Sequence, residues 1–117
     1  MRVSVFIFLI TTFSAAIPAC FPKSNPEQDK VDKTSVALHF LEGNLERYKA
    51  KFGKYPSTEE GLKALVESKS LVEIPRDGWG REIMYVLNSE RSYTISSLGA
   101  DGKPGGEGFD RDLQLVN

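Results

Sequence analysis

The stretch ALHFLEGNLERYKAKFGKYP, residues 37–56, decides the fold because its apolar residues recur at helical spacing. Successive members of the set lie three or four residues apart, which places their side chains on one face of an α-helix. The set consists of Leu38, Leu41, Leu45, Tyr48 and Phe52, widened by Ala37 and Phe40. The pattern predicts a helix from about Lys33 to Lys51, ended by a capping glycine at Gly53. Such an apolar face needs a second layer to cover it, and the only candidates lie downstream.

A second, shorter helix is predicted directly after this stretch. Pro56 and Ser57 stand at its start, and Glu60 completes a capping box with Ser57. Apolar residues at helical spacing carry the helix to about Ser68. The adjacent acids Glu59 and Glu60 suit the positive end of a helix, and we do not interpret them as an acid–base pair.

A small antiparallel sheet is predicted to cover the long helix. After a loop over residues 69–82, β-branched and aromatic residues indicate strands at 83–87 and 92–98, joined by a turn at 88–91. A last short strand is expected at 113–116. The expected fold class is therefore α+β, with one long helix packed on a small antiparallel sheet and a short second helix.

The loop that follows the second strand, SLGADGKPGGEGFDRD at residues 97–112, is rich in glycine and aspartate. It holds five of the ten glycines of the chain, together with Asp101, Asp110 and Asp112. Glycine loses more backbone entropy on folding than any other residue, so ordering this loop is costly. Composition alone leaves two outcomes: a disordered acidic loop, or a loop that a bound ligand orders.

Composition narrows the classes of function. The net charge of −1 and the scattered basic residues disfavour nucleic-acid binding. The single Cys forbids an internal disulfide, and the single His disfavours a histidine-based zinc site or a Ser-His-Asp triad. No nucleophile–base pair or cofactor loop is apparent, so we do not expect an enzyme or a small-molecule substrate.

The first residues resemble an export signal. One Arg precedes an uncharged apolar run from Val3 to Ile17, and small residues follow. Cys20 comes directly after Ile17-Pro18-Ala19, which resembles a bacterial lipobox except at Pro18. Three alternatives stay open: lipidation of Cys20, cleavage by ordinary signal peptidase after Ala16 or Ala19, or an uncleaved membrane anchor. All three place the folded part outside the cytoplasm.

The chain thus divides into an export signal at 1–19, a segment at 20–33 that starts with Cys20, and a globular domain at 34–117. Residues 21–33 are polar and contain two prolines, so we expect a flexible tether.

Several separated motifs resemble one family. These are LERYKAKFGKYPSTEEGLKALV at 45–66, RDGWG at 76–80 and YTISSLGADGKPGGEGFDRDL at 93–113. They are similar to the globular domain of the major pseudopilin of type II secretion, the G-type protein, in the right order and over roughly residues 36–113. The matching pieces are Tyr55-Pro56-Ser57, Gly61-Leu62, Asp77-Gly78-Trp79-Gly80 and Ser97 to Asp112. Gly78 stands where the family has a proline.

The resemblance implies a calcium site in the loop. It maps side-chain ligands onto Asp101, Asp110 and Asp112, a backbone carbonyl onto Leu98, and we add a further carbonyl from residues 103–108. Carboxylates and carbonyls are the oxygen ligands that Ca²⁺ prefers, and glycines let carbonyls turn inward. Binding energy at such a site would become folding energy.

The resemblance also implies a non-catalytic role in type II secretion. The implied partners are other pseudopilins or secretion-system components, and a membrane reached through a lipid or helix anchor on the periplasmic side of the envelope. The apolar run from Val3 to Ile17 lacks the glutamate that drives filament assembly in the family. We therefore expect an accessory or a diverged relative. The alternative is an envelope lipoprotein that uses the same fold as a binding module unrelated to secretion.

Two single residues have structural interpretations. Trp79, between two glycines, is expected to be a packing anchor for the 69–82 loop, with a contact residue as the alternative. His39, beside the apolar stripe, is expected on the helix surface.

Overall fold

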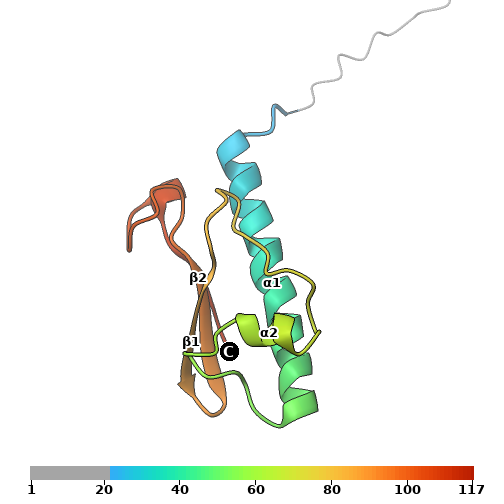
Figure 1. The fold of residues 1–117 in the computed structure, drawn as a ribbon. Helices are drawn as coiled ribbons and strands as arrows, with labels where there is room; N and C mark the ends of the chain where they lie inside the picture. Colours follow the sequence, from blue (N-terminus) through green and yellow to red (C-terminus); the bar gives the residue numbers. More distant parts are fainter. Residues whose placement is uncertain (1–21) are drawn as a thin grey trace, which may run out of the picture.

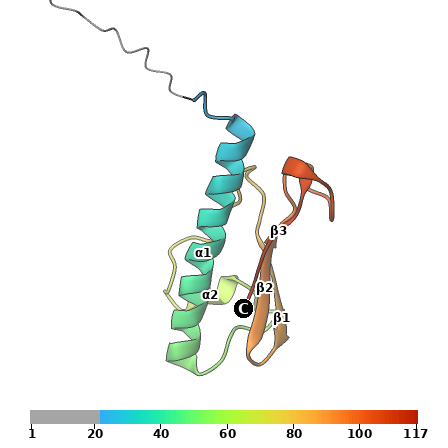
Figure 2. The same ribbon diagram turned by 180° about the vertical axis from the view of Figure 1, so that it is seen from behind.

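The computed structural model describes residues 22–117 (Figure 1). The export signal predicted at 1–19 and the predicted lipidation at Cys20 lie outside these residues. The described elements are, in order, α1 (Pro26–Phe52), α2 (Lys63–Glu67), β1 (Met84–Ser89), β2 (Ser92–Ser97), the 3₁₀ helix η1 (Gly108–Asp110) and β3 (Leu113–Val116). Figures 1 and 2 show from opposite sides that α1 and the sheet form two layers. The expected α+β class is confirmed.

α1 begins about two turns before the predicted start at Lys33. The Asn25 side chain caps its first turn by accepting a hydrogen bond from the Glu27 amide at 3.1 Å. Pro26 is tolerated at the start of the helix because the first amides have no partner there in any case. The acids Glu27 and Asp29 complement the helix dipole. The prediction that residues 26–33 belong to a flexible tether is therefore wrong.

The predicted end of α1 and the predicted capping box are both present. Gly53 has a φ of 80°, and its N–H donates to the Lys49 carbonyl at 2.7 Å. The Ser57 and Glu60 amides and side chains exchange two hydrogen bonds of 3.1 Å. The turn that they cap is interrupted because Gly61 has a φ of 58°, which a right-handed helix does not accept. α2 therefore covers only Lys63–Glu67, and the longer predicted helix is wrong.

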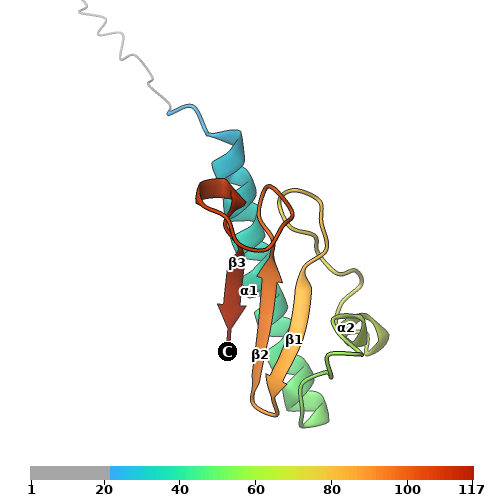
Figure 3. The same cartoon turned by 90° about the vertical axis from the view of Figure 1, so that its left-hand side faces the viewer.

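The sheet has the order β1-β2-β3, and both pairs are antiparallel (Figure 3). Tyr85 pairs with Ile95, which pairs with Leu115, so these three side chains share one face of the sheet. That face packs on α1, and the opposite face exposes Met84, Val86 and Val116. The predicted hairpin and the predicted last strand are confirmed.

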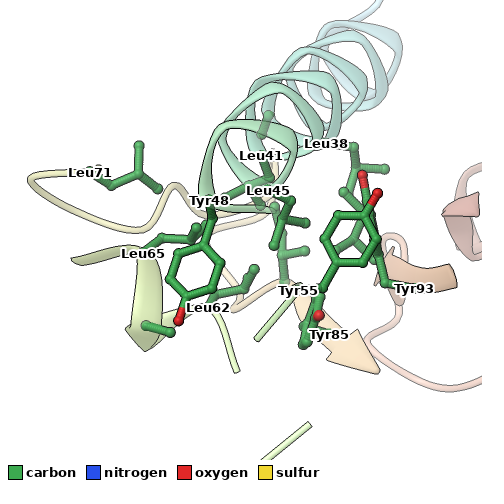
Figure 4. Close-up of a cluster of buried hydrophobic side chains, with 14 residues drawn as sticks. Leu38, Leu41, Leu45, Tyr48, Tyr55, Leu62, Leu65, Leu71, Tyr85 and Tyr93 are labelled. Carbon is green, nitrogen blue, oxygen red and sulfur yellow. The ribbon is translucent and has the colours of Figure 1, made fainter. Parts of the chain in front are cut away.

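The core lies between α1, α2 and the inner face of the sheet (Figure 4). Leucines from the helices meet a group of tyrosines from the sheet and from the turn after α1. The largest fully buried apolar side chains are Leu41, Leu45, Leu65, Tyr93 and Ile95. Two members of the predicted stripe are not core residues, because Phe40 is 51% exposed and Phe52 is 46% exposed. Phe52 lies in the last turn of α1 and contacts Tyr48 at 4.4 Å between ring centroids.

Within residues 22–117, none of the helices combines the length and the apolarity that crossing a membrane requires.

Candidate metal centre

The glycine-rich loop between β2 and β3 folds back on itself (orange to red in Figure 1). The Ala100 amide donates to the Phe109 carbonyl at 2.9 Å and so joins the two limbs of the loop. Gly99, with a φ of 73°, lies so close to the other limb that a Cβ atom would stand 2.6 Å from the Arg111 carbonyl oxygen. Only glycine meets both conditions at this position. The two ends of the loop are therefore held together by the backbone.

Asp112 is the acid of the loop most suited to a cation. Its Oδ2 accepts a hydrogen bond from the Gly105 amide at 3.1 Å, which draws the loop tip toward the start of β3. Its Oδ1 is buried and has no hydrogen-bond partner among the described residues. A buried carboxylate oxygen without a partner is costly, and a bound cation would remove that cost.

The other two predicted aspartates are exposed. Asp101 Oδ1 accepts a hydrogen bond from the Lys103 amide at 2.9 Å, and the Asp110 side chain lies at the surface. Between residues 22 and 117, no three side chains of Asp, Glu, His or Cys are arranged to hold a metal ion together. The fold thus brings Leu98, Asp110 and Asp112 to the joined ends of the loop, but it does not preassemble a carboxylate cluster.

Asp77, which the sequence marks only as part of the motif shared with the family, is a buried carboxylate. It is 2% exposed and accepts three hydrogen bonds. Its Oδ1 receives the amides of Trp79 and Arg81 at 3.0 and 2.9 Å, and its Oδ2 receives the Ser97 hydroxyl at 2.7 Å. Asp77 therefore joins the turn at residues 77–81 to the last residue of β2, from which the loop departs. An acidic residue that precedes Gly78 gives no sequence signal of such a distant partner.

Arg81 extends this connection into the loop. Its Nη1 donates to the carbonyls of Gly99 and Ala100 at 2.8 and 3.1 Å, and its Nη2 donates to Ala100 at 3.2 Å. The guanidinium also lies against Gly102, where a Cβ atom would stand 2.6 Å from Arg81 Nε. Hydrogen bonds thus join the turn at 77–81 to the loop, and no local sequence pattern predicts this connection.

The same turn holds the first turns of α1. Gly78 packs on the helix so closely that a Cβ atom added to it would overlap the Lys30 carbonyl oxygen, at 2.1 Å. The Gly78 amide donates to Thr34 Oγ1 at 2.8 Å. A proline at position 78, as in the resembling family, has no amide to donate and carries a ring where the Lys30 backbone lies.

Trp79 anchors its turn to α1, in agreement with the first of its two interpretations. Its half-buried ring lies in the turn, and its Nε1 donates to Glu27 Oε2 at 3.1 Å. Hydrogen bonds from Lys30 and then from Trp79 lower the pKa of Glu27. His39 is exposed on α1, as expected.

The core tyrosines offer no general base near neutral pH. Burial is the main cause that raises the pKa of Tyr85 and of Tyr93 to about 12. Burial, followed by the hydrogen bond to Glu46, also raises the pKa of Tyr55. These phenols stay protonated. Tyr55 donates a hydrogen bond to Glu46 and Tyr85 donates one to the Pro56 carbonyl, whereas the buried Tyr93 hydroxyl has no partner among the described residues.

Comparison with known proteins agrees with this architecture. Residues 23–116 match the family described as "Type II secretion system (T2SS), protein G". The chain is 31% identical over 121 residues to the type II secretion system core protein G of Pseudomonas aeruginosa, covering 92% of this chain and 85% of that protein. It is also 31% identical to the protein of the same name from Vibrio cholerae, covering 76% of this chain and 70% of the relative.

A solved structure shows the same fold. The crystal structure of the major pseudopilin from the type 2 secretion system of enterohaemorrhagic Escherichia coli matches with a TM-score of 0.63 and 28% identity. The match covers 75% of this chain and 87% of that chain. The family model matches nearly all of the described residues, and the long helix and three-stranded sheet agree with the solved structure. This chain therefore belongs to the type II secretion system protein G family.

Proposed function

We propose that this protein is a non-catalytic pseudopilin component of, or accessory to, type II protein secretion, and that it works on the periplasmic side of the envelope. The family match over residues 23–116 carries the proposal. As a member of a pseudopilin family the chain is not an enzyme, so its contribution is shape and contacts. Its partners in this proposal are other pseudopilins or further secretion components.

Co-purification with the pseudopilins of the same cell tests the partner. The full chain is retained on an affinity resin with calcium present, and the captured proteins are identified by mass spectrometry. Retention of at least one pseudopilin supports the secretion role. Capture of none, with the bait shown to be folded, would favour the binding module unrelated to secretion, and the genetic neighbourhood of the chain gives an independent check.

We also propose that Ca²⁺ stabilises the loop. The residues that would hold it are the three aspartates and one carbonyl: Asp101, Asp110, Asp112 and Leu98. The buried, unpartnered Oδ1 of Asp112 supports the proposal, and so does the backbone closure that brings Gly99 against the Asp110–Arg111 segment. Because the described acids form no preassembled cluster, binding requires the exposed aspartates to move. When bound, the cation supplies charge neutralisation and crosslinks the two limbs of the loop.

Thermal unfolding with calcium and with chelator tests the metal. Calcium at about 100 times its dissociation constant stabilises the folded state by about 2.7 kcal/mol, so chelator should lower the Tm measurably. Asp101→Ala or Asp110→Ala should bring the Tm in calcium close to the chelator value. Glu107→Ala, which removes an acid from the same loop outside the proposed ligand set, is the matched control. An unchanged wild-type Tm in chelator would rule out the site.

Lipidation of Cys20 is the proposed membrane anchor. The mass of the mature N-terminal peptide from the native membrane fraction tests it directly. A diacyl or triacyl Cys20 supports the proposal. An unmodified peptide from this region would leave signal-peptidase cleavage or a helical anchor.

A further inference from the structure

The first limb of the loop, which directly follows β2, contains two proposed calcium ligands, the carbonyl of Leu98 and the side chain of Asp101. Gly99 and Ala100 lie between them, and their backbone determines how the two ligands are placed relative to one another. Both of these intervening residues have their carbonyls bound by one side chain, the guanidinium of Arg81, at 2.8 to 3.2 Å.

We infer that Arg81 is a positioning residue for the proposed calcium loop. It holds the backbone between Leu98 and Asp101 in place before any metal binds. The inference rests on the proposed calcium function and assigns to Arg81 no contact with the metal.

The anchoring of Arg81 itself supports this role. Its amide donates to the buried Asp77 carboxylate, and its carbonyl accepts from the Asp77 amide at 3.0 Å. The other oxygen of that carboxylate binds Ser97, the last residue of β2. Arg81 is therefore fixed relative to the sheet at its backbone and fixed to the loop at its side chain. It therefore connects the sheet to the glycine-rich loop.

The hydrogen bonds of Arg81 also select among carbonyls. Arg81 donates to the carbonyls of Gly99 and Ala100 and not to that of Leu98. An arginine nitrogen carries a positive charge and donates only, so a carbonyl that it binds is a poor ligand for a cation. The guanidinium therefore does not compete with a metal for the Leu98 carbonyl, which is the proposed ligand.

The positive charge of Arg81 opposes calcium binding, whereas its hydrogen bonds to the loop favour it. A guanidinium near a divalent cation weakens binding, but the Arg81 side chain is exposed, and salt screens such interactions. Residues that orient metal ligands from outside the first coordination sphere typically change metal affinity about 10- to 100-fold when they are removed. We therefore expect positioning to outweigh repulsion, and Arg81→Gln to weaken calcium binding.

Calcium titration of the full chain in detergent tests the inference, with Tm measured in parallel in chelator. Arg81→Gln should raise the dissociation constant for calcium about 10- to 100-fold. Arg81→Lys keeps the charge but loses the planar fork, so it should also weaken binding, by less. Arg91→Gln removes the same charge at the β1–β2 turn, the opposite end of β2 from the loop, and should leave the affinity within about twofold of wild type.

The outcomes separate the inference from the calcium proposal. If wild type itself binds no calcium, the calcium proposal is wrong and this inference falls with it. If wild type binds and Arg81→Gln binds equally well or more tightly, the calcium site stands and the positioning role is overturned. A lower Tm in chelator with an unchanged calcium affinity also overturns it, because that result describes a purely structural arginine.

A second measurement covers the case in which Arg81→Gln does not fold. Hydrogen exchange of the amides of residues 99–101 is then compared between wild type and Arg81→Lys in chelator. Faster exchange in the lysine variant at these amides, with the sheet unchanged, supports the positioning role. Equal exchange contradicts it.

Discussion

The two ends of this molecule are held together by different forces. At the end where α1 finishes, leucines and tyrosines from α1, α2 and the sheet bury apolar surface. At the end where α1 begins, the first turns of the helix, the turn at 77–81 and the loop are joined by hydrogen bonds and close glycine contacts. The apolar end loses stability roughly in step with the volume removed from it. The polar end depends on contacts made by a few single atoms. Adding or removing one such atom therefore destabilises the neighbouring segments more than the small change in side-chain volume suggests.

Removing a leucine from the apolar end should give the largest effect. Leu45 is fully buried against the sheet, so Leu45→Ala leaves a cavity and should lower the free energy of unfolding by about 2–5 kcal/mol. Denaturant unfolding measures it, and the effect should be global. Val72→Ala is the control, because Val72 is 98% exposed and its truncation should change stability by less than about 0.5 kcal/mol. Equal effects of the two variants would show that the core is not where the structure places it.

Adding one methyl group at the polar end should give the next largest effect. Gly78→Ala places a Cβ atom against the Lys30 backbone, which has to shift, and overpacking of this kind costs about 1–3 kcal/mol. The loss should be local, with faster hydrogen exchange in residues 26–34 and an unchanged sheet.

The same substitution inside α1 is a matched control. A Cβ atom added to Gly43 would meet nothing within 4 Å, so Gly43→Ala should stabilise the helix by about 0.5–1 kcal/mol. If Gly78→Ala also stabilised the protein, the close packing of the turn on α1 would be contradicted.

Removing the cap of α1 should give the smallest effect. Asn25→Ala deprives the Glu27 amide of its acceptor and should cost about 1 kcal/mol, seen as fraying of the first turn by hydrogen exchange. Asn25→Asp keeps a side-chain oxygen in the same place and should retain the stability. If the alanine variant frayed no more than the aspartate variant, the polar contacts of Gly78 and Trp79 alone would be enough to hold the start of α1.

Local sequence patterns predicted much of the fold because they depend on near neighbours. The stripe through Leu38, Leu41 and Leu45 follows from helical spacing, and the cap at Gly53 follows from the same few residues. The hairpin follows from two β-rich runs and a short turn. Asn25-Pro26 is also a local helix-start signal, but interpreting the proline as part of a linker hides it. Spacing does not state how much of α1 the other elements cover, so the exposure of Phe40 and Phe52 is seen only in the structure.

The family, the long helix, the sheet and the acidic glycine-rich loop can all be inferred from the amino-acid sequence. How the polar end is joined becomes visible only in the folded chain. The Gly78–Thr34, Asp77–Ser97 and Arg81–Gly99 contacts link residues far apart along the chain. Such pairs follow from how the packed helix and sheet bring distant backbone together, and no local periodicity encodes them. For the same reason Asp101, Asp110 and Asp112 are recognisable as candidate ligands from the sequence, whereas the buried oxygen of Asp112 and the contacts of Arg81 with the loop depend on tertiary packing.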